Sequence, residues 1–324
     1  MLTARRRGGL RSGITDAGLG LADRLRRRGL TVLGARTRAL TAALSGDRFW
    51  IEVDGVRVGG SLIHHGRYLR LLVQGGFGSP LFHLGVFERA LSPGMVIVDC
   101  GAHIGLHTVL AARSVGSTGK VIALEPDPVN LRALHANVEA NGLADRVEVV
   151  EAAASERPGS VRLHLDSSLD VSMRATGSID PLGGFPNGVG DRVQGSDSLH
   201  SSIDVPCVTL DDVVGERFDV AKIDVEGAEP EVLRGMAKAL RRSRGATVFI
   251  ECHPSAMLRA GTSPAEWLTT LRDGGSLLLI DEHSRRLLPA SDDEIDRAVR
   301  ELGGWPFNVL WNVGEAQRAG ADHL

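Results

Sequence analysis

From residue 95 onward, short apolar segments alternate with helical patterns, and this alternation constrains the fold more than any other feature of the chain. Strands are expected at Met95–Asp99, Val121–Glu125, Val147–Val150, Phe218–Asp224, Thr247–Glu251, Ser276–Asp281 and Phe307–Val313. Between several of these segments, apolar residues recur three or four positions apart, as they do on one face of a helix. Such alternation is typical of a doubly wound, mainly parallel α/β sheet. Ligands of such sheets bind at the edge formed by the carboxyl ends of the strands.

The first 45 residues form a basic leader. Residues 1–40 hold ten arginines against Asp16 and Asp23, a net charge of about +8, although the whole chain carries −3. We expect the leader to be partly helical or disordered. A basic amphipathic helix that contacts a membrane surface or an acidic partner is the alternative. No apolar segment follows the first arginines, so a secretory signal is not indicated.

Residues 46–94 are expected to form a small β-rich cap. The pair Asp54-Gly55 lies between two apolar segments and predicts a hairpin. A further strand is expected at Tyr68–Val73. Pro80–Leu91 has helical spacing of its apolar residues.

Composition excludes several classes of protein. With 43% hydrophobic and 24% charged residues, the chain is neither disordered nor fibrous. No segment of 18 apolar residues occurs, so a transmembrane helix is not expected. The excess of positive charge is confined to the leader, because the remainder of the chain carries a net charge of −11. This distribution argues against a nucleic-acid partner. The three cysteines are scattered without a Cys-x-x-Cys motif, which fits a reducing, cytoplasmic location.

Residues 166–204 interrupt the alternation of strands and helices. Twenty of these 39 residues are Gly, Ser or Asp, and no periodicity is present. A loop of this length in a compact domain is usually a functional lid or a disordered insertion. Both alternatives remain open from the sequence.

A glycine turn follows the first strand of the main region. Asp99, Gly101 and Gly105 form an Asp-x-Gly-x-x-x-Gly pattern, without the three glycines that cradle a dinucleotide pyrophosphate. Asp99 would repel a pyrophosphate but could hold a cationic amino group. Glu125 ends the next strand, where a carboxylate can accept hydrogen bonds from both hydroxyls of a ribose. The combination of Asp99, the two glycines, their place after a strand and Glu125 is a much more specific signal of a cofactor site than the glycine turn alone.

Five segments of the chain resemble one known family. They are Val96–Thr108, Val121–Pro128, Val208–Asp212, Lys222–Glu229 and Ile250–Pro254. The sequence is similar there to the FkbM-type methyltransferases, a class I group with a Rossmann-like fold that depends on S-adenosylmethionine. The resemblance covers about residues 94–256. It implies a seven-stranded sheet whose last strand is antiparallel, and a methyltransferase domain that extends over 95–324.

The resemblance also implies the residues that hold the cofactor. Asp99, Gly101 and Gly105 would line its methionine end, Glu125 its ribose, and Ala152 its adenine. His103, within the same turn, would lie beside the methionine end. It replaces the asparagine that is common in the family, and His107 stands where an aromatic residue is common.

Polar residues at the ends of two later strands are the candidates for acceptor chemistry. Lys222, Asp224 and Glu226 alternate along one strand end, and Glu251 and His253 along the next, so each set is expected on one face. His253 or Asp224 would accept the proton of an acceptor hydroxyl, and neighbouring carboxylates would raise the pKa of His253 unless burial opposes them. A structural ion pair is the alternative role for Lys222.

A metal at this cluster is a further alternative. Oxygen ligands of Asp224 and Glu251, together with Glu226 and His253, could hold Mg²⁺, although their spacing does not require it. His103 and His107 are four residues apart, but a third metal ligand is missing from the sequence around them.

The expected function is O-methylation of a small molecule, such as a sugar or a secondary metabolite (a polyketide, for example). Two alternatives remain. One is a nicotinamide-dependent oxidoreductase, against which the glycine pattern argues. The other is a non-catalytic binding protein of the same fold, against which the intact cofactor residues argue.

Overall fold

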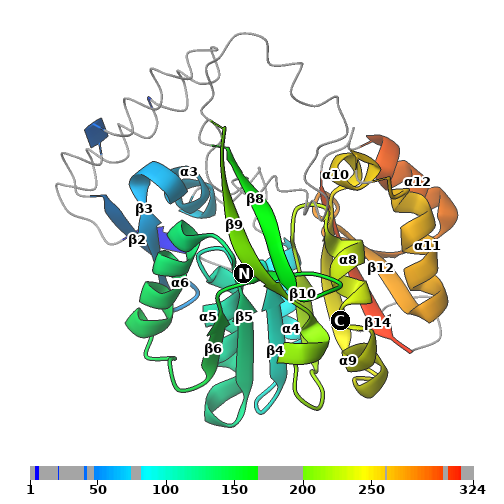
Figure 1. Ribbon diagram of the computed structural model, residues 1–324, viewed down its shortest axis with the longest axis horizontal. Helices are drawn as coiled ribbons and strands as arrows, with labels where there is room; N and C mark the ends of the chain where they lie inside the picture. The colour runs from blue at the N-terminus through cyan, green and yellow to red at the C-terminus, as the bar shows by residue number, and fades with distance from the viewer. Residues whose placement is uncertain are drawn as a thin grey trace.

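The computed structural model describes residues 4–6, 21, 40–41, 47–73, 82–166, 200–259, 261–301 and 306–314. Its central feature is an eight-stranded sheet with the strand order β13-β12-β14-β11-β10-β4-β5-β6 (Figure 1). The strands are β4 (Val96–Cys100), β5 (Lys120–Leu124), β6 (Val147–Val150), β10 (Val220–Ile223), β11 (Thr247–Cys252), β12 (Gly275–Asp281), β13 (Arg286–Pro289) and β14 (Phe307–Val313).

The sheet is mainly parallel, as the alternation predicts. Strands β11, β10, β4, β5 and β6 run parallel to one another, whereas β14 lies antiparallel between β11 and β12. The expectation of an α/β fold with an antiparallel last strand is therefore confirmed. The expected number of seven strands is one too few, because β13 pairs with β12 as an added edge strand. Its four residues, which end in a proline, carry too short a pattern to indicate a strand.

Helices cover both faces of the sheet. On one face lie α5 (Leu106–Val115) and α6 (Pro128–Ala140) with the cap, and on the other α7 (Leu210–Val213), α8 (Glu229–Arg234), α9 (Ala237–Arg242), α11 (Pro264–Gly274) and α12 (Asp292–Glu301). The short α10 (Pro254–Arg259) follows β11, and a 3₁₀ turn, η1 (Gly116–Thr118), follows α5. Alternate residues of each strand point to opposite faces, so that Ile97 packs into the first core and Val98 into the second.

Helix α6 begins with a side-chain cap. The Asp127 carboxylate accepts a hydrogen bond from the Val129 backbone at 2.7 Å, and Pro128 occupies the first turn. Helix α11 begins with a similar cap, in which the Ser263 side chain accepts a hydrogen bond from the Glu266 backbone. Of the described helices, none is long and apolar enough to cross a membrane.

The cap contains one hairpin and two helices. Strands β2 (Arg48–Val53) and β3 (Val56–Ser61) pair antiparallel around Asp54 and Gly55, both of which have a positive φ, so the hairpin prediction is confirmed. In the leader, Ala4–Arg6 form a short strand, β1, which pairs with β2. This strand differs from the helical or disordered leader that the sequence predicts. Most other leader residues lie outside the described part.

The strand predicted at Tyr68–Val73 is wrong. These residues belong to α3 (Leu62–Val73), whose buried side chains are Leu62, His65, Leu69 and Leu72. Their spacing of three, four and three places them on one face of a helix, a pattern that the short apolar run hides. The cap is therefore less β-rich than expected. The predicted second cap helix is present as α4 (Phe82–Arg89).

Helix α6 covers the open edge of the cap hairpin. The Asn137 side chain bonds both the N–H and the C=O of Gly59, at 2.8 and 2.9 Å. Asn141 bonds both backbone groups of Arg57 in the same way, at 2.8 and 2.7 Å. Asn137 and Asn141 are four residues apart on the helix, a rise of about 6 Å. Gly59 and Arg57 are two residues apart on β3, a distance of about 6.6 Å. The two side-chain amides therefore have nearly the same spacing as the two backbone positions that they bond. These bonds fix the cap onto the cofactor-side helix.

A second small sheet projects from the main body. Strand β9 (His200–Val208) pairs antiparallel with β8 (Gly159–Asp166) and parallel with the short β7 (Ala153–Ala154) (Figure 1). Both ends of the segment 166–204 are therefore strands rather than an aperiodic loop. Residues 167–199 lie outside the described part, so the lid stays a prediction.

Candidate active site

The glycine turn after β4 can be made only with glycine. Gly101 has a φ of +77°, and a Cβ placed on it would lie 1.9 Å from the backbone oxygen of Asp224. Gly105 has a φ of +86°, and its Cβ would lie 2.4 Å from the Leu134 side chain of α6. Both positions combine a left-handed backbone with a close neighbour, so a side chain at either would displace the turn. The turn thereby brings β4, α6 and the end of β10 into contact.

Glu125 lies directly after β5 with its carboxylate held by three donors. Oε2 accepts from the His103 backbone at 2.7 Å, and Oε1 accepts from the Asp127 backbone at 2.9 Å and the Asn130 side chain at 3.2 Å. Burial raises the pKa of Glu125 to about 7, although these hydrogen bonds oppose the shift. The carboxyl group is thus fixed in direction, and its charge changes near neutral pH. Its contact with a ribose stays a prediction.

A hydrogen-bonded chain connects Glu125 to the cap. His65 accepts a bond from the Ser61 backbone through Nδ1 at 2.9 Å. Its Nε2 must therefore carry the proton, which it donates to Asn130 Oδ1 at 3.1 Å. Asn130 then donates to Glu125 through its amide nitrogen. The buried cap histidine thus orients the asparagine that positions the carboxylate.

His103 occupies the left-handed region within the turn, with a φ of +55°. Asparagine tolerates this backbone conformation better than most residues, which explains its frequency at this position in the family that the sequence resembles. The imidazole ring lies edge-to-face against His65 and Tyr68, with centroids 5.5 and 4.9 Å away. Ala152 is buried just after β6, and its position beside an adenine stays a prediction.

Asp99 lies behind the turn, without exposure to solvent. Its Oδ2 accepts a hydrogen bond from the Thr108 hydroxyl at 2.6 Å, and its Oδ1 lies 3.6 Å from the Lys222 ammonium. This carboxylate therefore fixes the turn from inside. Direct contact with a cofactor amino group stays a prediction.

Lys222 adopts the ion-paired arrangement. Its ammonium lies 3.1 Å from Asp224 Oδ2 and donates to the Gly101 carbonyl at 2.9 Å. Burial alone would lower the pKa of Lys222, but the carboxylates of Asp224 and Asp99 outweigh burial and raise it. At Asp224, burial alone would raise the pKa, but Lys222, Glu251 and His253 together outweigh burial and hold the pKa of that carboxyl well below its usual range. Lys222 therefore stays charged and joins the two strand ends.

The remaining polar residues continue this array. The side chains of Asp224 and Glu251 share a hydrogen bond, and Glu251 Oε2 lies 2.9 Å from His253 Nε2. Glu226 Oε2 lies 3.5 Å from the same nitrogen. We refer to Lys222, Asp224, Glu226, Glu251 and His253 as the charged cluster. The two sets that strand alternation groups separately are thus brought together at one end of the sheet.

The charged cluster is partly open to solvent and strongly coupled. Burial lowers the pKa of His253, but Glu251, Glu226 and Glu229 outweigh it and raise this pKa to about 10, as the neighbouring carboxylates predict. Burial raises the pKa of Glu226 and Glu251. The Asp224 side chain keeps 31% exposure and Glu251 26%, so a ligand can reach them.

Tyr68 is a site residue that sequence reasoning missed. It is the single tyrosine of the chain and reaches from α3 to the ring of His103. Burial raises its pKa, and the charges of Lys222 and Asp224 act on it as well. A helical interpretation of residues 62–73 would have placed Tyr68 beside the buried stripe, but no local pattern indicates its distant partners.

The two possible metal sites differ in outcome. His107 is half-buried, stacks on His83 at 6.1 Å and packs against Phe87. Among the described residues, no group of three possible metal ligands includes His103 or His107. Burial lowers the pKa of His107 well below the usual range. By contrast, ligand atoms of Asp224, Glu226 and His253 lie within 4.8 Å of one another. Glu251, which the sequence offers as a possible ligand, hydrogen-bonds His253.

Comparison with known proteins identifies a domain family. The FkbM methyltransferase domain matches residues 99–278, more than half of the chain. The chain is 31% identical over 167 residues to the 31-O-demethyl-FK506 methyltransferase FkbM of Streptomyces tacrolimicus, covering 46% of this chain and 62% of that protein. It is 38% identical over 68 residues to a ribosomal protein L11 methyltransferase of Chloroflexus aurantiacus, covering 21% of this chain and 20% of that one.

The chain spans less than two thirds of the length of these curated relatives. Among solved structures, it is similar to an rRNA methylase of Streptococcus thermophilus, with a TM-score of 0.40, 14% identity, and coverage of 71% of this chain and 93% of that one.

Proposed function

Because the chain belongs to the FkbM methyltransferase domain family, we propose that it is an S-adenosylmethionine-dependent methyltransferase that acts on a hydroxyl of a small molecule. The acceptor class that we propose is a sugar or another secondary metabolite. The three cysteines are free and buried, which supports a reducing compartment such as the cytoplasm.

One observation carries the proposal: the cofactor turn and the charged cluster are in backbone contact. Gly101 lies against the Asp224 carbonyl so closely that a Cβ would overlap it. The Asp224 N–H also donates to Cys100 at 3.1 Å, and Lys222 donates to Gly101. A methyl group held over this turn would therefore be delivered beside Asp224. Such positioning of two reactants can contribute about 7–11 kcal/mol in favourable cases.

The residues present fit the proposed cofactor. The glycine turn packs directly against the end of β10. Glu125 offers a fixed carboxylate at the end of the neighbouring strand. Glu125 would hold the ribose hydroxyls, and the turn around His103 would hold the methionine end. When bound, S-adenosylmethionine supplies a methyl group that is already activated by its sulfonium charge.

The charged cluster would orient the acceptor and remove its proton. An aliphatic hydroxyl is a far weaker acid than any group here, so the proton must leave as the new bond to carbon forms. His253 would take this proton in its neutral form, and Asp224 would accept a hydrogen bond from the hydroxyl and orient it. His253 must lose its own proton before it can act as the base. Glu226 Oε2 lies 3.5 Å from His253 Nε2 and can receive that proton. A general base typically contributes ~10²–10⁴-fold to the rate.

A divalent cation is the alternative means of orienting the hydroxyl. Asp224, Glu226 and His253 could hold Mg²⁺ through the three atoms that lie within 4.8 Å of one another. His253 would have to be neutral to bind a cation. If a cation acts here, EDTA abolishes activity and added Mg²⁺ restores it; full activity in EDTA excludes this alternative.

The test of the proposal is a transfer assay with a labelled cofactor. The protein is incubated with S-adenosylmethionine carrying a trideuterated methyl group and with small-molecule extracts of its source organism. Mass spectrometry should find one extract component that gains a single labelled methyl, which NMR places on oxygen. Asp224→Asn and His253→Gln should lose this product. A labelled nitrogen or carbon, or normal turnover by both variants, would contradict the proposal.

A further inference from the structure

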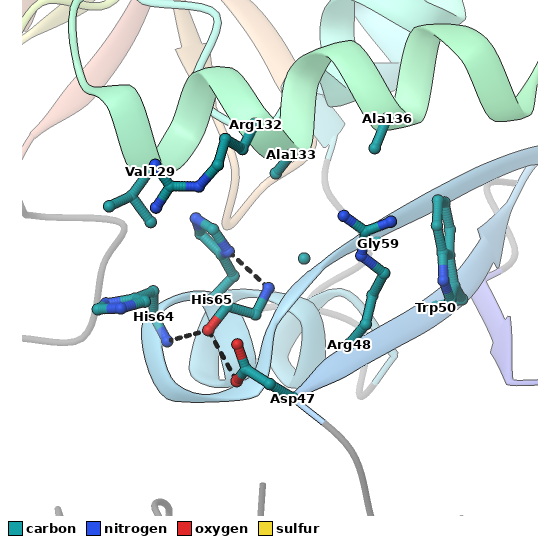
Figure 2. Close-up of a pocket in the computed structure, with 12 residues that line it drawn as sticks. Asp47, Arg48, Trp50, Gly59, His64, His65, Val129, Arg132, Ala133 and Ala136 are labelled. Atoms are coloured by element: carbon teal, nitrogen blue, oxygen red, sulfur yellow. Dashed lines mark hydrogen bonds between the residues drawn. The ribbon is translucent and has the colours of Figure 1, made fainter.

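A cavity of about 420 Å³ lies between the cap and helix α6, apart from the charged cluster (Figure 2). Its walls come from the hairpin β2–β3, the first turn of α3 and the outer side of α6. None of the five residues of the charged cluster lines it. The volume falls within the range of small-molecule sites, about 300–1,000 Å³. The cavity is therefore a separate space of sufficient size for a metabolite.

Two arginines from different elements reach into this cavity. Arg48 comes from β2 and Arg132 from α6, and Figure 2 shows both side chains directed into the space between hairpin and helix. Within the described part of the chain, neither guanidinium has a carboxylate partner. The Arg48 guanidinium lies 6.0 Å from the centre of the Trp50 ring. The ring carries no net charge, so the positive charge of Arg48 is not compensated by this contact. The cavity thus contains two positive charges that come from opposite walls.

Among the described residues, the acidic residue of the lining, Asp47, is not ion-paired with either arginine, so the lining carries two positive charges against one negative charge. Asp47 Oδ1 accepts hydrogen bonds from the Ser61 hydroxyl at 2.9 Å and from the Ile63 backbone at 3.3 Å. This carboxylate therefore caps the start of α3, as the dashed lines around it in Figure 2 partly show. The histidines His64 and His65 line the same wall and add no negative charge. The cavity as a whole favours an anion.

We propose that this cavity is a second small-molecule site, which takes the phosphate monoester of a small metabolite. Two guanidinium groups match the double negative charge of a phosphate monoester, and each can donate two parallel hydrogen bonds to its oxygens. The space is larger than an inorganic phosphate ion requires, so the organic part of the ester also lies inside. The site does not depend on the proposed methyl transfer.

The test is calorimetric titration of the full chain without S-adenosylmethionine, so that its outcome is independent of activity. The probes are glucose 6-phosphate, inorganic phosphate, glucose and glucuronate. Glucose 6-phosphate should bind at one site and more tightly than inorganic phosphate, and glucose should not bind. Equal binding of inorganic phosphate would show a site for the free ion, and tighter binding of glucuronate a carboxylate site; either result overturns the proposal, as does the absence of binding by both phosphates.

Variants locate the binding to this cavity. Arg132→Gln and Arg48→Gln should each weaken glucose 6-phosphate binding roughly tenfold or more, because each removes a charge-assisted contact. Arg57→Gln is the matched control: Arg57 lies over the same Trp50 ring at 5.0 Å but does not line the cavity. Both tested arginines are exposed, so the variants should keep the unfolding temperature of the wild type. Unchanged binding in both variants, or an equal loss in Arg57→Gln, would overturn the assignment.

Discussion

Asn130 donates its side-chain amide to Glu125 at 3.2 Å, while its carbonyl oxygen accepts a hydrogen bond from the cap. The donor in the cap is His65, so a region without sequence resemblance to the family positions the carboxylate that we assign to the cofactor ribose. In the proposed cofactor site, the cap therefore has a part in cofactor binding as well as in packing on the domain.

Asn130→Ala should weaken S-adenosylmethionine binding. The substitution removes one donor to Glu125 and releases the orientation that His65 imposes. A hydrogen bond to a charged group contributes about 1.5–3 kcal/mol, so we expect an affinity loss of roughly tenfold to one hundredfold by calorimetry. Asn141→Ala is the control, because Asn141 fixes the same hairpin to α6 without contact to Glu125. Equal losses in both variants would show that only cap docking matters.

Cofactor affinity should depend on pH through Glu125. Burial raises the pKa of this carboxyl to about 7, so it is largely neutral at pH 6 and largely ionised at pH 8. The ionised form is the better acceptor for ribose hydroxyls. Affinity for S-adenosylmethionine should therefore fall as the pH falls from 8 to 6. In Glu125→Gln the affinity should be lower and constant over this range. A wild-type affinity that does not change between these values would contradict the assignment.

Lys222→Met should reduce stability severely. The substitution leaves the carboxylates of Asp99 and Asp224 without their cation at the end of the sheet. Removal of one partner from a buried ion pair typically costs about 3–5 kcal/mol in the free energy of unfolding, which urea denaturation measures. The deficit should shrink as the pH falls, because the Asp224 carboxyl, without its cation, then takes up a proton.

The control for that substitution is Lys120→Met. Lys120 pairs with Glu148, but both side chains are 50% exposed, so its loss should cost at most about 1 kcal/mol. Equal stability losses at Lys120 and Lys222 would refute the structural importance of the buried pair.

His253→Gln should lower turnover by roughly 10²–10⁴-fold without weakening cofactor binding. Because the pKa of His253 is raised to about 10, most of the imidazole is protonated at neutral pH. Wild-type kcat should therefore rise with pH. The positive sulfonium should move the plateau below pH 10, since it disfavours the protonated ring.

The corresponding control is His135→Gln, which changes an exposed histidine of α6 that pairs with Glu151. This variant should keep both kcat and its pH profile. If kcat of His253→Gln still rises with pH as in the wild type, another group titrates, and His253 does not take part in proton transfer.

Much of the charged cluster was predictable because strand alternation is a local property. A period of two places Lys222 and Asp224 on one face, and Glu251 and His253 on one face of the neighbouring strand. The opposition of Lys222 and Asp99, however, depends on the register between β10 and β4, which the sequence does not contain. The ion pair could therefore be suggested only as an alternative.

The cap was less predictable than the sheet. The apolar run around Tyr68 is short enough to fit a strand, and only the longer stripe that begins at Leu62 identifies a helix. The amide contacts of Asn137 and Asn141 with β3 join residues about 80 positions apart. Such contacts follow from tertiary packing, which local patterns do not encode.

The central claim is that the turn beside Glu125 binds S-adenosylmethionine, and calorimetric titration of S-adenosylhomocysteine tests it most directly. The wild type should bind one molecule per chain, and a folded Glu125→Ala variant should bind at least roughly tenfold more weakly, because the ribose loses a charge-assisted acceptor. Unchanged affinity in that variant, or the absence of binding to the folded wild type, would contradict the account.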